Sequence, residues 1–384
     1  YKRLNSYSRI NHLAKVTSTC LGLVILLLFL ASCTGSIKSA PYPPVLYIGW
    51  DGNGRSQIFR QEPDEAVSQL TDLESDIIDF SVSADATQVA FTALEADGTS
   101  SIWLMKVDGD QLRQILTCSE AECSQPVWAP DSRRLVYERR PISEGGIPGS
   151  SYLWWFDAET AETVAVLDDI EARGSAVRFS PDGEWLSYVS PEDEGAYLYN
   201  TKDGRSHFIP DEIGAPVAWS PASDQVVVPN LDLVIVHGDE GEDHLEHTHD
   251  YQSAVHLFTV DVESGDLEPI SEDLKVEDSV PAWSPGADWI AFGRRLAGPS
   301  AGRQLWLTRP DGSEVRAVTE DLTVNHGPPY WSPDGRYLLF QRIALDDPES
   351  EPGIWIIDVN TGEATNLIPV GMQPAWLSDT SAIR

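Results

Sequence analysis

The sequence has few cations, few cysteines and no apolar run long enough to span a membrane. Its 384 residues include 26 lysines and arginines against 61 aspartates and glutamates, a formal net charge of −35. Neutralising the phosphates of nucleic acid or of anionic lipid headgroups requires clustered cations, so both of these partners are excluded. The apolar run at residues 20–32 has 13 residues, whereas a helix needs about 20 to cross a bilayer.

The first 32 residues have the pattern of a secretory signal peptide. They carry four basic residues and no acidic residue, and end with the short apolar run. That run leads into Leu30-Ala31-Ser32-Cys33, which resembles the lipobox of bacterial lipoproteins. The resemblance implies that the chain is cut before Cys33 and that the Cys33 thiol is acylated. An uncleaved or ordinarily cleaved signal peptide with an incidental cysteine is the alternative.

The same resemblance implies a division of the chain and a location. Residues 1–32 are the signal peptide, residues 33–44 a lipidated, proline-containing flexible tether, and residues 45–384 the folded domain. We expect this domain outside the cytoplasm of a bacterium, held to the cell membrane or the outer membrane by its lipid anchor alone.

Two of the four cysteines lie in the predicted folded domain. Cys20 lies in the signal peptide and Cys33 is the acylation site, which leaves Cys118 and Cys123 at the two ends of a six-residue segment. In an oxidising compartment two such cysteines can form a disulfide. A structural zinc site would need four ligands, and no further cysteine is left to supply them. We therefore predict a Cys118–Cys123 disulfide.

A pattern of about 50 residues recurs along the rest of the chain. An aromatic residue is followed by Ser-Pro-Asp-Gly or a relative, and then by an apolar segment that ends in Phe or Tyr nine positions after the first aromatic. Pro fixes φ, Asp bonds its own backbone and Gly allows positive φ, so each copy predicts a tight turn between two strands. The copies begin at residues 82, 128, 179, 219, 283, 331 and 376.

Each copy except the last, which is truncated, continues into a third and a fourth predicted strand. The third contains an aromatic residue: Trp103, Trp154, Tyr197, Phe258, Trp306 or Trp355. Four short strands in each period are typical of a β-propeller blade, whose faces are buried by the neighbouring blades, so the repeated tryptophans are expected in the core. Residues 45–71 lack the opening strand and residues 374–376 lack the other three, so both ends of the chain are expected to build one closing blade. The sequence predicts an all-β, seven-bladed propeller of four-stranded antiparallel blades, with six blades as the alternative.

The repeat resembles that of TolB-type propellers, whose Trp-Ser-Pro-Asp-Gly strand pairs it matches along nearly all of residues 45–384. The resemblance implies the fold and a periplasmic scaffold. Similar propellers form the gating half of prolyl-oligopeptidase-like serine peptidases, in which the nucleophile stands on a separate α/β domain. Because the repeats leave no space for such a domain, we expect no serine nucleophile.

One interval between copies, of 64 residues from Trp219, contains five of the eight histidines. His244, His247 and His249, with acidic residues among them, are candidate ligands for a divalent metal such as Zn²⁺, Ni²⁺ or Cu²⁺. Oligogalacturonate lyases are propellers with a metal held by histidine, and this likeness makes a metal-assisted carbohydrate-active enzyme the alternative function. A solvated acidic loop without metal is the simpler interpretation.

Three arginines occupy equivalent positions, two residues after the aromatic of the second strand: Arg139, Arg294 and Arg342. Guanidinium groups bind carboxylates bidentately, so these residues are candidates for an anion-binding mouth on one face. Ion pairs with nearby acids such as Asp278 are the alternative.

The leading functional prediction is a non-catalytic scaffold. Such a monomeric propeller would bind a protein, a peptide or an anionic glycan at one face. The only cofactor that the sequence indicates is the divalent metal at the histidine segment.

Overall fold

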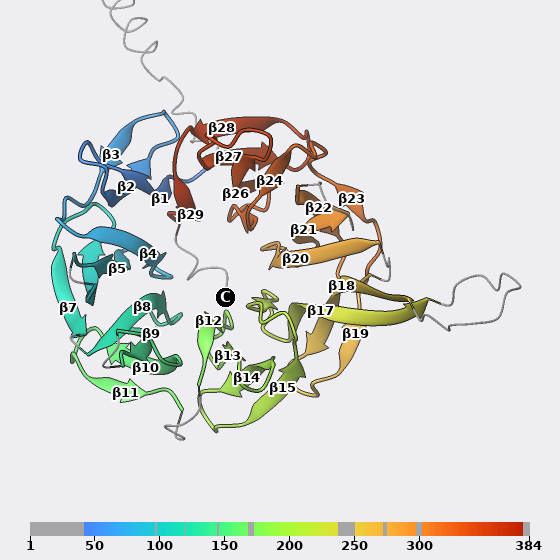
Figure 1. Ribbon diagram of the computed structural model, residues 1–384, viewed down its shortest axis with the longest axis horizontal. Coiled ribbons are helices and arrows are strands. Elements are labelled where there is room, and N and C mark those ends of the chain that lie inside the picture. The colour runs from blue at the N-terminus through green and yellow to red at the C-terminus, as the bar shows by residue number, and fades with distance from the viewer. Residues whose placement is uncertain are drawn as a thin grey trace, which may run out of the picture. The chain divides into compact units, whose positions relative to one another are not determined.

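A computed structural model describes residues 42–96, 98–118, 120–143, 146–167, 173–236, 250–271, 275–296 and 302–378, with side chains outside 232–253. These residues form strands, turns and loops and no helix. The sheets of residues 42–378 stand around a common centre (Figure 1). In three of the four-stranded sheets the inner edge strand is the first in sequence, and in the remaining one it is the last strand of the described chain. The prediction of an all-β propeller with four-stranded antiparallel blades is confirmed.

Four of the sheets have four strands each, ordered from the centre outwards. The strands of the first are β29 (Met372–Trp376), β1 (Val45–Trp50), β2 (Ser56–Gln61) and β3 (Val67–Gln69). Those of the second are β4 (Asp76–Val82), β5 (Gln88–Leu94), β6 (Ser100–Lys106) and β7 (Arg113–Cys118). Those of the third are β8 (Ala121–Trp128), β9 (Arg134–Pro141), β10 (Tyr152–Asp157) and β11 (Thr163–Ala165). Those of the fourth are β12 (Ser175–Phe179), β13 (Trp185–Ser190), β14 (Gly195–Asn200) and β15 (Ser206–Pro210).

The two remaining sheets are larger. One joins β16 (Ala218–Trp219), β17 (Gln225–Val236), β18 (Asp250–Asp261) and β19 (Leu267–Pro269) to β20 (Val276–Trp283), β21 (Ile290–Leu296), β22 (Gln304–Thr308) and β23 (Arg316–Ala317). Its two halves are connected by one parallel residue pair, Val255 with Glu277. The other contains β24 (Val324–His326), β25 (Tyr330–Trp331), β26 (Tyr337–Ala344), β27 (Gly353–Asp358) and β28 (Ala364–Ile368). Hydrogen bonding among the described residues therefore gives six sheets rather than seven.

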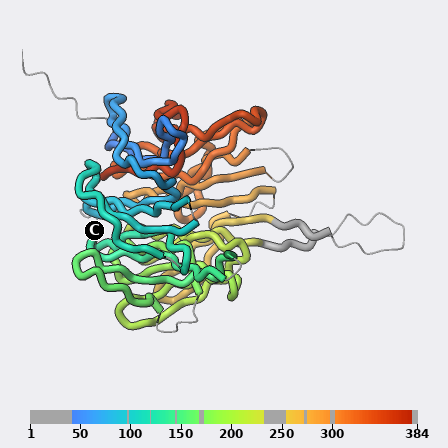
Figure 2. Tube along the Cα trace, turned by 60° about the vertical axis from the view of Figure 1, so that its left-hand side comes forward, coloured from blue at the N-terminus to red at the C-terminus, as the bar shows by residue number. Residues whose placement is uncertain are grey.

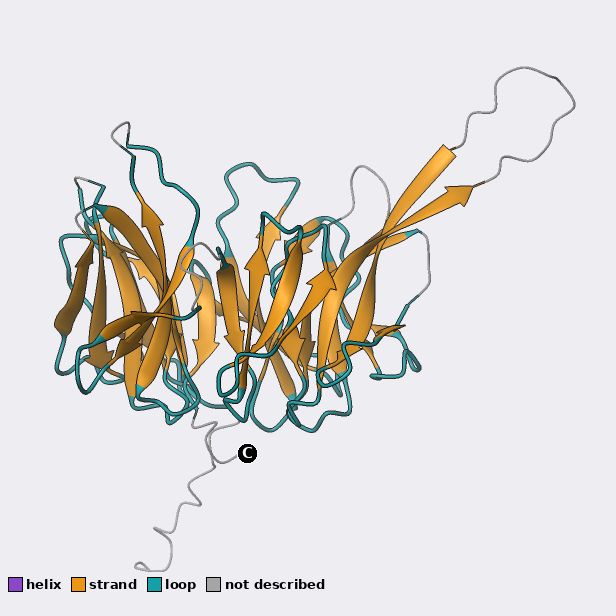
Figure 3. Ribbon diagram, turned by 90° about the horizontal axis from the view of Figure 1, so that it is seen from below, coloured by secondary structure: helices purple, strands orange, loops and turns teal. Residues whose placement is uncertain are grey.

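The Ser-Pro-Asp-Gly segments form the turns between first and second strands. In the copy that begins at Phe179, the Ser180 hydroxyl donates to Asp182 Oδ1 at 2.6 Å and accepts the N–H of Trp185 at 3.0 Å. Gly183 has a φ of 73°, which a residue with a Cβ rarely adopts. Neighbouring turns also touch, since the N–H of Asp182 donates to Ser223 Oγ in the next sheet at 3.1 Å. Figure 3 shows loops on both sides of the strands. The side on which these turns meet, with Pro130, Pro181, Pro221 and Pro285 around one pocket, is called the turn face.

Apolar burial lies between neighbouring sheets. Leu46 and Ile58 of the first sheet pack against Ile77 and Phe91 of the second, and all four are fully buried. Burying one such side chain stabilises the fold by about 1.5–3 kcal/mol, and only an adjacent sheet can supply that burial here. The other buried clusters likewise join one set of strands to the next. A single sheet of this size would leave both faces in water.

Bulges in the innermost strands create a second kind of link. Gln125, Ala176 and Gln373 have positive φ at such bulges, so their N–H groups turn away from the strand ladder. Each N–H is bound by a side chain of the preceding sheet. The acceptors are Asp79 Oδ2 at 2.9 Å, Glu138 Oε1 at 2.8 Å and Gln341 Oε1 at 3.3 Å, respectively.

The ring is closed by the two ends of the described chain. β29 pairs antiparallel with β1, with Val45 opposite Trp376 and Leu46 opposite Ala375. Figure 2 shows the red C-terminal strand beside the blue N-terminal strands. The prediction that both termini build the closing blade is confirmed by this pairing.

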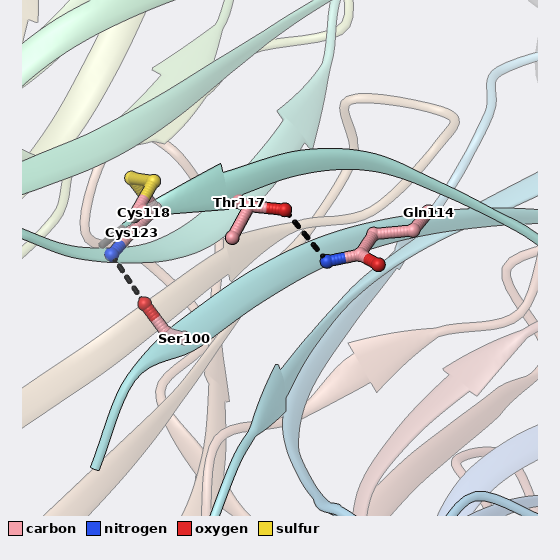
Figure 4. Close-up of a disulfide and its surroundings, with 5 residues drawn as sticks. All are labelled: Ser100, Gln114, Thr117, Cys118 and Cys123. Carbon is pink, nitrogen blue, oxygen red and sulfur yellow. Dashed lines mark hydrogen bonds between the residues drawn. A yellow bond between two sulfur atoms is a disulfide. The ribbon is translucent and has the colours of Figure 1, made fainter. Parts of the chain in front are cut away.

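A disulfide joins the second sheet to the third. Cys118 at the end of β7 is bonded to Cys123 in β8, with their Cα atoms 6.0 Å apart (Figure 4). Cys123 is fully buried, and its N–H donates to Ser100 Oγ at 2.6 Å. The bond therefore fixes the crossing from the outermost strand of one sheet to the innermost strand of the next.

Replacing Trp376 tests the importance of ring closure. Its indole N–H donates to the Tyr330 carbonyl at 3.0 Å, and its ring lies 6.1 Å from that of Tyr42. We expect Trp376→Ala to lower the free energy of unfolding by about 3 kcal/mol, measured by urea denaturation. Trp50→Ala is the control, because Trp50 is 41% exposed and its loss should change stability by about 0.5 kcal/mol or less. Equal effects of the two substitutions would contradict this role of Trp376.

Asp79→Asn tests the bulge link through pH. Burial raises the pKa of the Asp79 carboxyl above its ordinary value of 3.8. The protonated Asp79 carboxyl contributes its full stabilisation of the folded state at pH values below 3.8. This stabilisation is lost as the pH rises through the raised pKa, because the buried carboxyl then ionises. Asn keeps an acceptor for Gln125 without the charge, so we expect the variant to be more stable than wild type at pH 7.

The difference should shrink as denaturation is repeated at pH values falling towards 4. Asp346→Asn, at an exposed position, is the control and should show no such trend. A variant less stable than wild type at neutral pH would mean that the charged carboxylate is required.

Candidate functional site

The innermost strands end around an apolar pocket at the centre of the turn face. Its volume is about 480 Å³, within the range of ligand sites. We call it the axial pocket. It is lined by residues at or near the start of the turns: Ala84, Pro130, Pro181, Trp219, Pro221, Ala282, Trp283, Pro285, Pro329, Tyr330, Trp331, Ala375 and Trp376.

The repeat explains why so many sheets contribute to this pocket. Five of the first strands are followed by the motif proline, which lacks an N–H and ends the strand at the same point of the repeat. The first copy has Ala84 at this position. Two indole rings are held in place by bonds to the preceding sheet: Trp331 Nε1–H donates to the Ala282 carbonyl and Trp376 Nε1–H to the Tyr330 carbonyl, both at 3.0 Å. The tryptophans do pack partly between sheets, as expected, but four of them also line the pocket.

A cation and a phenol stand at the level of the pocket. Arg178 on β12 and Tyr330 on β25 keep solvent-accessible surface, although surrounding protein groups partly desolvate both side chains. Burial raises the pKa of Tyr330, and Arg178 opposes that shift. Since β12 and β25 belong to sheets that are not neighbours in the ring, the interaction between these two side chains crosses the centre.

A second cavity, of about 460 Å³, is polar and lies beside Asp211. This carboxyl is 1% exposed and burial raises its pKa. Its two oxygens accept the N–H groups of Ile213 and Ala215, both at 2.9 Å. Asp211 therefore shapes its own loop and is not aimed at a ligand.

The three predicted anion-binding arginines lie on different sheets, and each stands over a third-strand tryptophan of its own sheet. Arg294 binds Asp278 bidentately at 2.7 and 2.8 Å and lies 5.1 Å from the ring of Trp306. Arg342 pairs with Asp321 at 3.1 Å and lies 4.5 Å from Trp355. Arg139 lies 5.8 Å from Trp154. This arrangement favours the ion-pairing alternative for Arg294 and Arg342.

The predicted metal ligands His244, His247 and His249, and the predicted lipidation site Cys33, lie outside the described residues. Among the residues that are described, no three His, Cys, Asp or Glu side chains are grouped so that they could hold a metal ion. The described part of the chain also contains no helix with the length and apolar character needed to span a membrane.

One sequence motif bears on the expectation that the chain has no serine nucleophile. Residues 298–302 read Gly-Pro-Ser-Ala-Gly, a Gly-x-Ser-x-Gly pentapeptide. It falls in the connection between β21 and β22, two adjacent antiparallel strands of one sheet. A nucleophile elbow instead leads from a strand into a helix of an α/β domain, whereas the described elements on either side of this pentapeptide are both strands.

The sequence matches no family model and no curated protein. Solved structures resemble it in fold. TolB from Acinetobacter baumannii is 13% identical, with 87% of this chain and 66% of that one covered and a TM-score of 0.51. A puromycin hydrolase is 14% identical over 86% and 53% of the two chains, with a TM-score of 0.61. An oligogalacturonate lyase in complex with manganese is 13% identical over 85% of each chain, with a TM-score of 0.56.

The chain thus spans about two thirds of the length of that TolB protein and about half of the hydrolase. At sequence identities this low, the similarity shows a shared fold and does not show a shared activity. In fold, the chain is a TolB-like β-propeller.

Proposed function

We propose that this chain is a lipid-anchored, extracytoplasmic binding protein whose propeller is a non-catalytic scaffold for a segment of a protein or peptide. The observation that carries the proposal is the axial pocket, a cavity of about 480 Å³ lined by tryptophans, prolines and alanines. Such a surface buries apolar side chains of a ligand, and the indole rings suit stacking on aromatic or proline rings.

The chemistry of the lining supports binding rather than catalysis. Among the lining residues, Tyr330 alone carries a titratable group. General acid–base catalysis most often uses a positioned His, Asp or Glu, and none of these lines the pocket. The carboxylates of Asp79 and Glu138 accept backbone N–H groups of neighbouring sheets.

The number of blades is part of the same proposal. Seven buried clusters join successive units around the ring. One of them packs Val227 and Leu257 against Ile290 and Phe292, between the two halves of the eight-stranded sheet. Since one parallel pair alone connects these halves, we count β16–β19 and β20–β23 as separate blades and infer seven in total.

An anchor at Cys33 would limit how the pocket is presented. The Tyr42 ring lies 5.8 Å from Tyr337 and 6.1 Å from Trp376, so the chain enters the propeller beside the axial pocket. The nine residues from Cys33 to Tyr42 span at most about 30 Å when fully extended. We therefore propose that the turn face is held near the membrane. The Cys118–Cys123 disulfide is compatible with the oxidising compartment that this location implies.

Peptide binding by the axial pocket is the direct test. We expect residues 34–384 to bind members of a peptide array rich in Trp, Phe and Pro, and Trp283→Ala to weaken the best binder at least tenfold. The indole N–H of Trp283 has no partner among the described residues, so the substitution removes pocket surface without breaking a known hydrogen bond. Affinity is measured by isothermal titration calorimetry.

The matched control is Trp289→Ala, in the turn that follows Trp283. Trp289 does not line the pocket and stacks under Arg309 at 3.9 Å, so its loss should leave affinity unchanged. Absence of any peptide binding would refute the proposed function. Turnover of polygalacturonate by the metal-loaded protein would instead support the lyase alternative.

Anchoring is tested by Cys33→Ser. In a bacterial host we expect wild type to incorporate an alkyne-labelled fatty acid and to sediment with membranes, and the variant to lose both properties because it lacks the thiol. Cys20→Ser, within the predicted signal peptide, is the control and should keep both. A Cys33→Ser protein that still carries the label would refute acylation at this residue.

A further inference from the structure

Arg178 occupies a position in the repeat that is defined by strand register. It directly precedes the motif aromatic Phe179, as Ala282 precedes Trp283 and Ala375 precedes Trp376. Tyr330 likewise precedes Trp331. Each of these residues pairs with a residue of the neighbouring strand: Arg178 with Ser187, Ala282 with Ala291, Tyr330 with Leu339 and Ala375 with Leu46. Ala282, Tyr330 and Ala375 line the axial pocket. Arg178 therefore stands at the level of the lining, where two other sheets place alanine.

The hydrogen-bonding capacity of Arg178 is mostly unused. One guanidinium nitrogen donates to the Val177 carbonyl at 2.8 Å. No carboxylate of the described residues lies within ion-pair distance of Arg178, whereas Arg294 and Arg336 each have an aspartate at 2.7–2.8 Å. A guanidinium carries five N–H donors, so several remain for a ligand.

The surroundings of Arg178 exclude the obvious internal partner. Glu138 interacts with it electrostatically, but the oxygens of Glu138 already accept the Ala176 N–H, the Ser151 hydroxyl and an Arg140 N–H. Across the centre stands Tyr330, whose hydroxyl is a further donor. A cation and a phenol thus face the centre at the edge of an otherwise apolar cavity.

We propose that Arg178, assisted by Tyr330, binds the C-terminal carboxylate of a peptide whose last side chains are apolar and fill the axial pocket. This inference rests on the proposed function and names its ligand chemistry. Charge complementarity selects an anion, and a charge-assisted bond from guanidinium to carboxylate is stronger than one between neutral groups. An N-terminal ammonium would be repelled by the same guanidinium.

The shape of the site favours a chain end over an internal segment. The pocket is lined by residues of several different sheets and holds about 480 Å³. A chain end brings one backbone extension into this volume, whereas an internal segment brings two. An acidic side chain within a peptide therefore suits the site less well than a terminal carboxylate.

The test uses two probes that differ only at the terminus: N-acetyl-Pro-Trp-Phe with a free carboxylate, and the same peptide as its C-terminal amide. Binding to residues 34–384 is measured by isothermal titration calorimetry at physiological salt. We expect the acid to bind at least tenfold more tightly than the amide, a difference of about 1.4 kcal/mol. Arg178→Gln should reduce the affinity for the acid to that for the amide and leave the amide unchanged. Arg113→Gln, at an exposed position on β7, is the matched control and should keep the preference.

The outcomes separate this inference from the function on which it rests. Equal binding of acid and amide by wild type would overturn the carboxylate proposal while the peptide-binding function stands. The same holds if an amidated peptide with an internal glutamate binds as tightly as the free acid. If neither probe nor any array peptide binds to wild type, both proposals fall. The acid–amide comparison needs no variant, so a poorly folded Arg178→Gln protein would not prevent a decision.

Discussion

The pairing of β29 with β1 is the constraint on which the other features depend. Each sheet buries its apolar faces only against its neighbours, so the first sheet is covered on both sides only if the last strand of the chain returns to it. Trp376 and Gln373 then connect that strand to the preceding and following sheets: the Trp376 indole reaches the Tyr330 carbonyl, and Gln373 Nε2 donates to the Ile78 carbonyl at 2.9 Å. Without this strand the ring would end in two exposed faces, and the innermost strands would no longer surround a common centre.

The axial pocket is a consequence of closure combined with repetition. Because every sheet has the same register, residues at one level of the repeat are brought together at the centre although they lie far apart in sequence. Small and aromatic residues at that level, such as Ala282, Ala375 and Trp283, leave an apolar space. The same level supplies structural bonds through the backbone carbonyls of Ala282 and Tyr330. One set of positions therefore both joins the sheets and lines the site, which limits how far the lining can vary without loosening the ring.

Local chemistry made much of the fold predictable. Residues 45–71, expected to lack only the opening strand of a blade, contain β1, β2 and β3, and the third-strand aromatics fall in β6, β10, β14, β18, β22 and β27. These elements were predictable because turn residues and strand periodicity act over a few neighbouring residues. Contacts across the ring were not predictable from that signal: Asp79 and Gln125 are 46 residues apart and meet only because a bulge turns one N–H towards the next sheet. The arginine pattern was recognised at Arg294, but its burial against Asp278 depends on the neighbouring strand β20. Arg178 could have been found by aligning the residue before each motif aromatic, where it is the one cation among mostly small or apolar residues.

The overall charge of the chain and the cation at its centre act at different ranges. A net charge of −35 repels anionic ligands as they approach, but at physiological ionic strength this repulsion is screened beyond about 8 Å from the surface. A peptide with many acidic residues would remain close to that surface over much of its length and would be disfavoured. A peptide with an apolar end carries a single charge, and that charge reaches Arg178 only after the neighbouring side chains have filled the pocket. The acidic exterior and the central arginine therefore both favour ligands whose only anionic group is the carboxylate at the chain end.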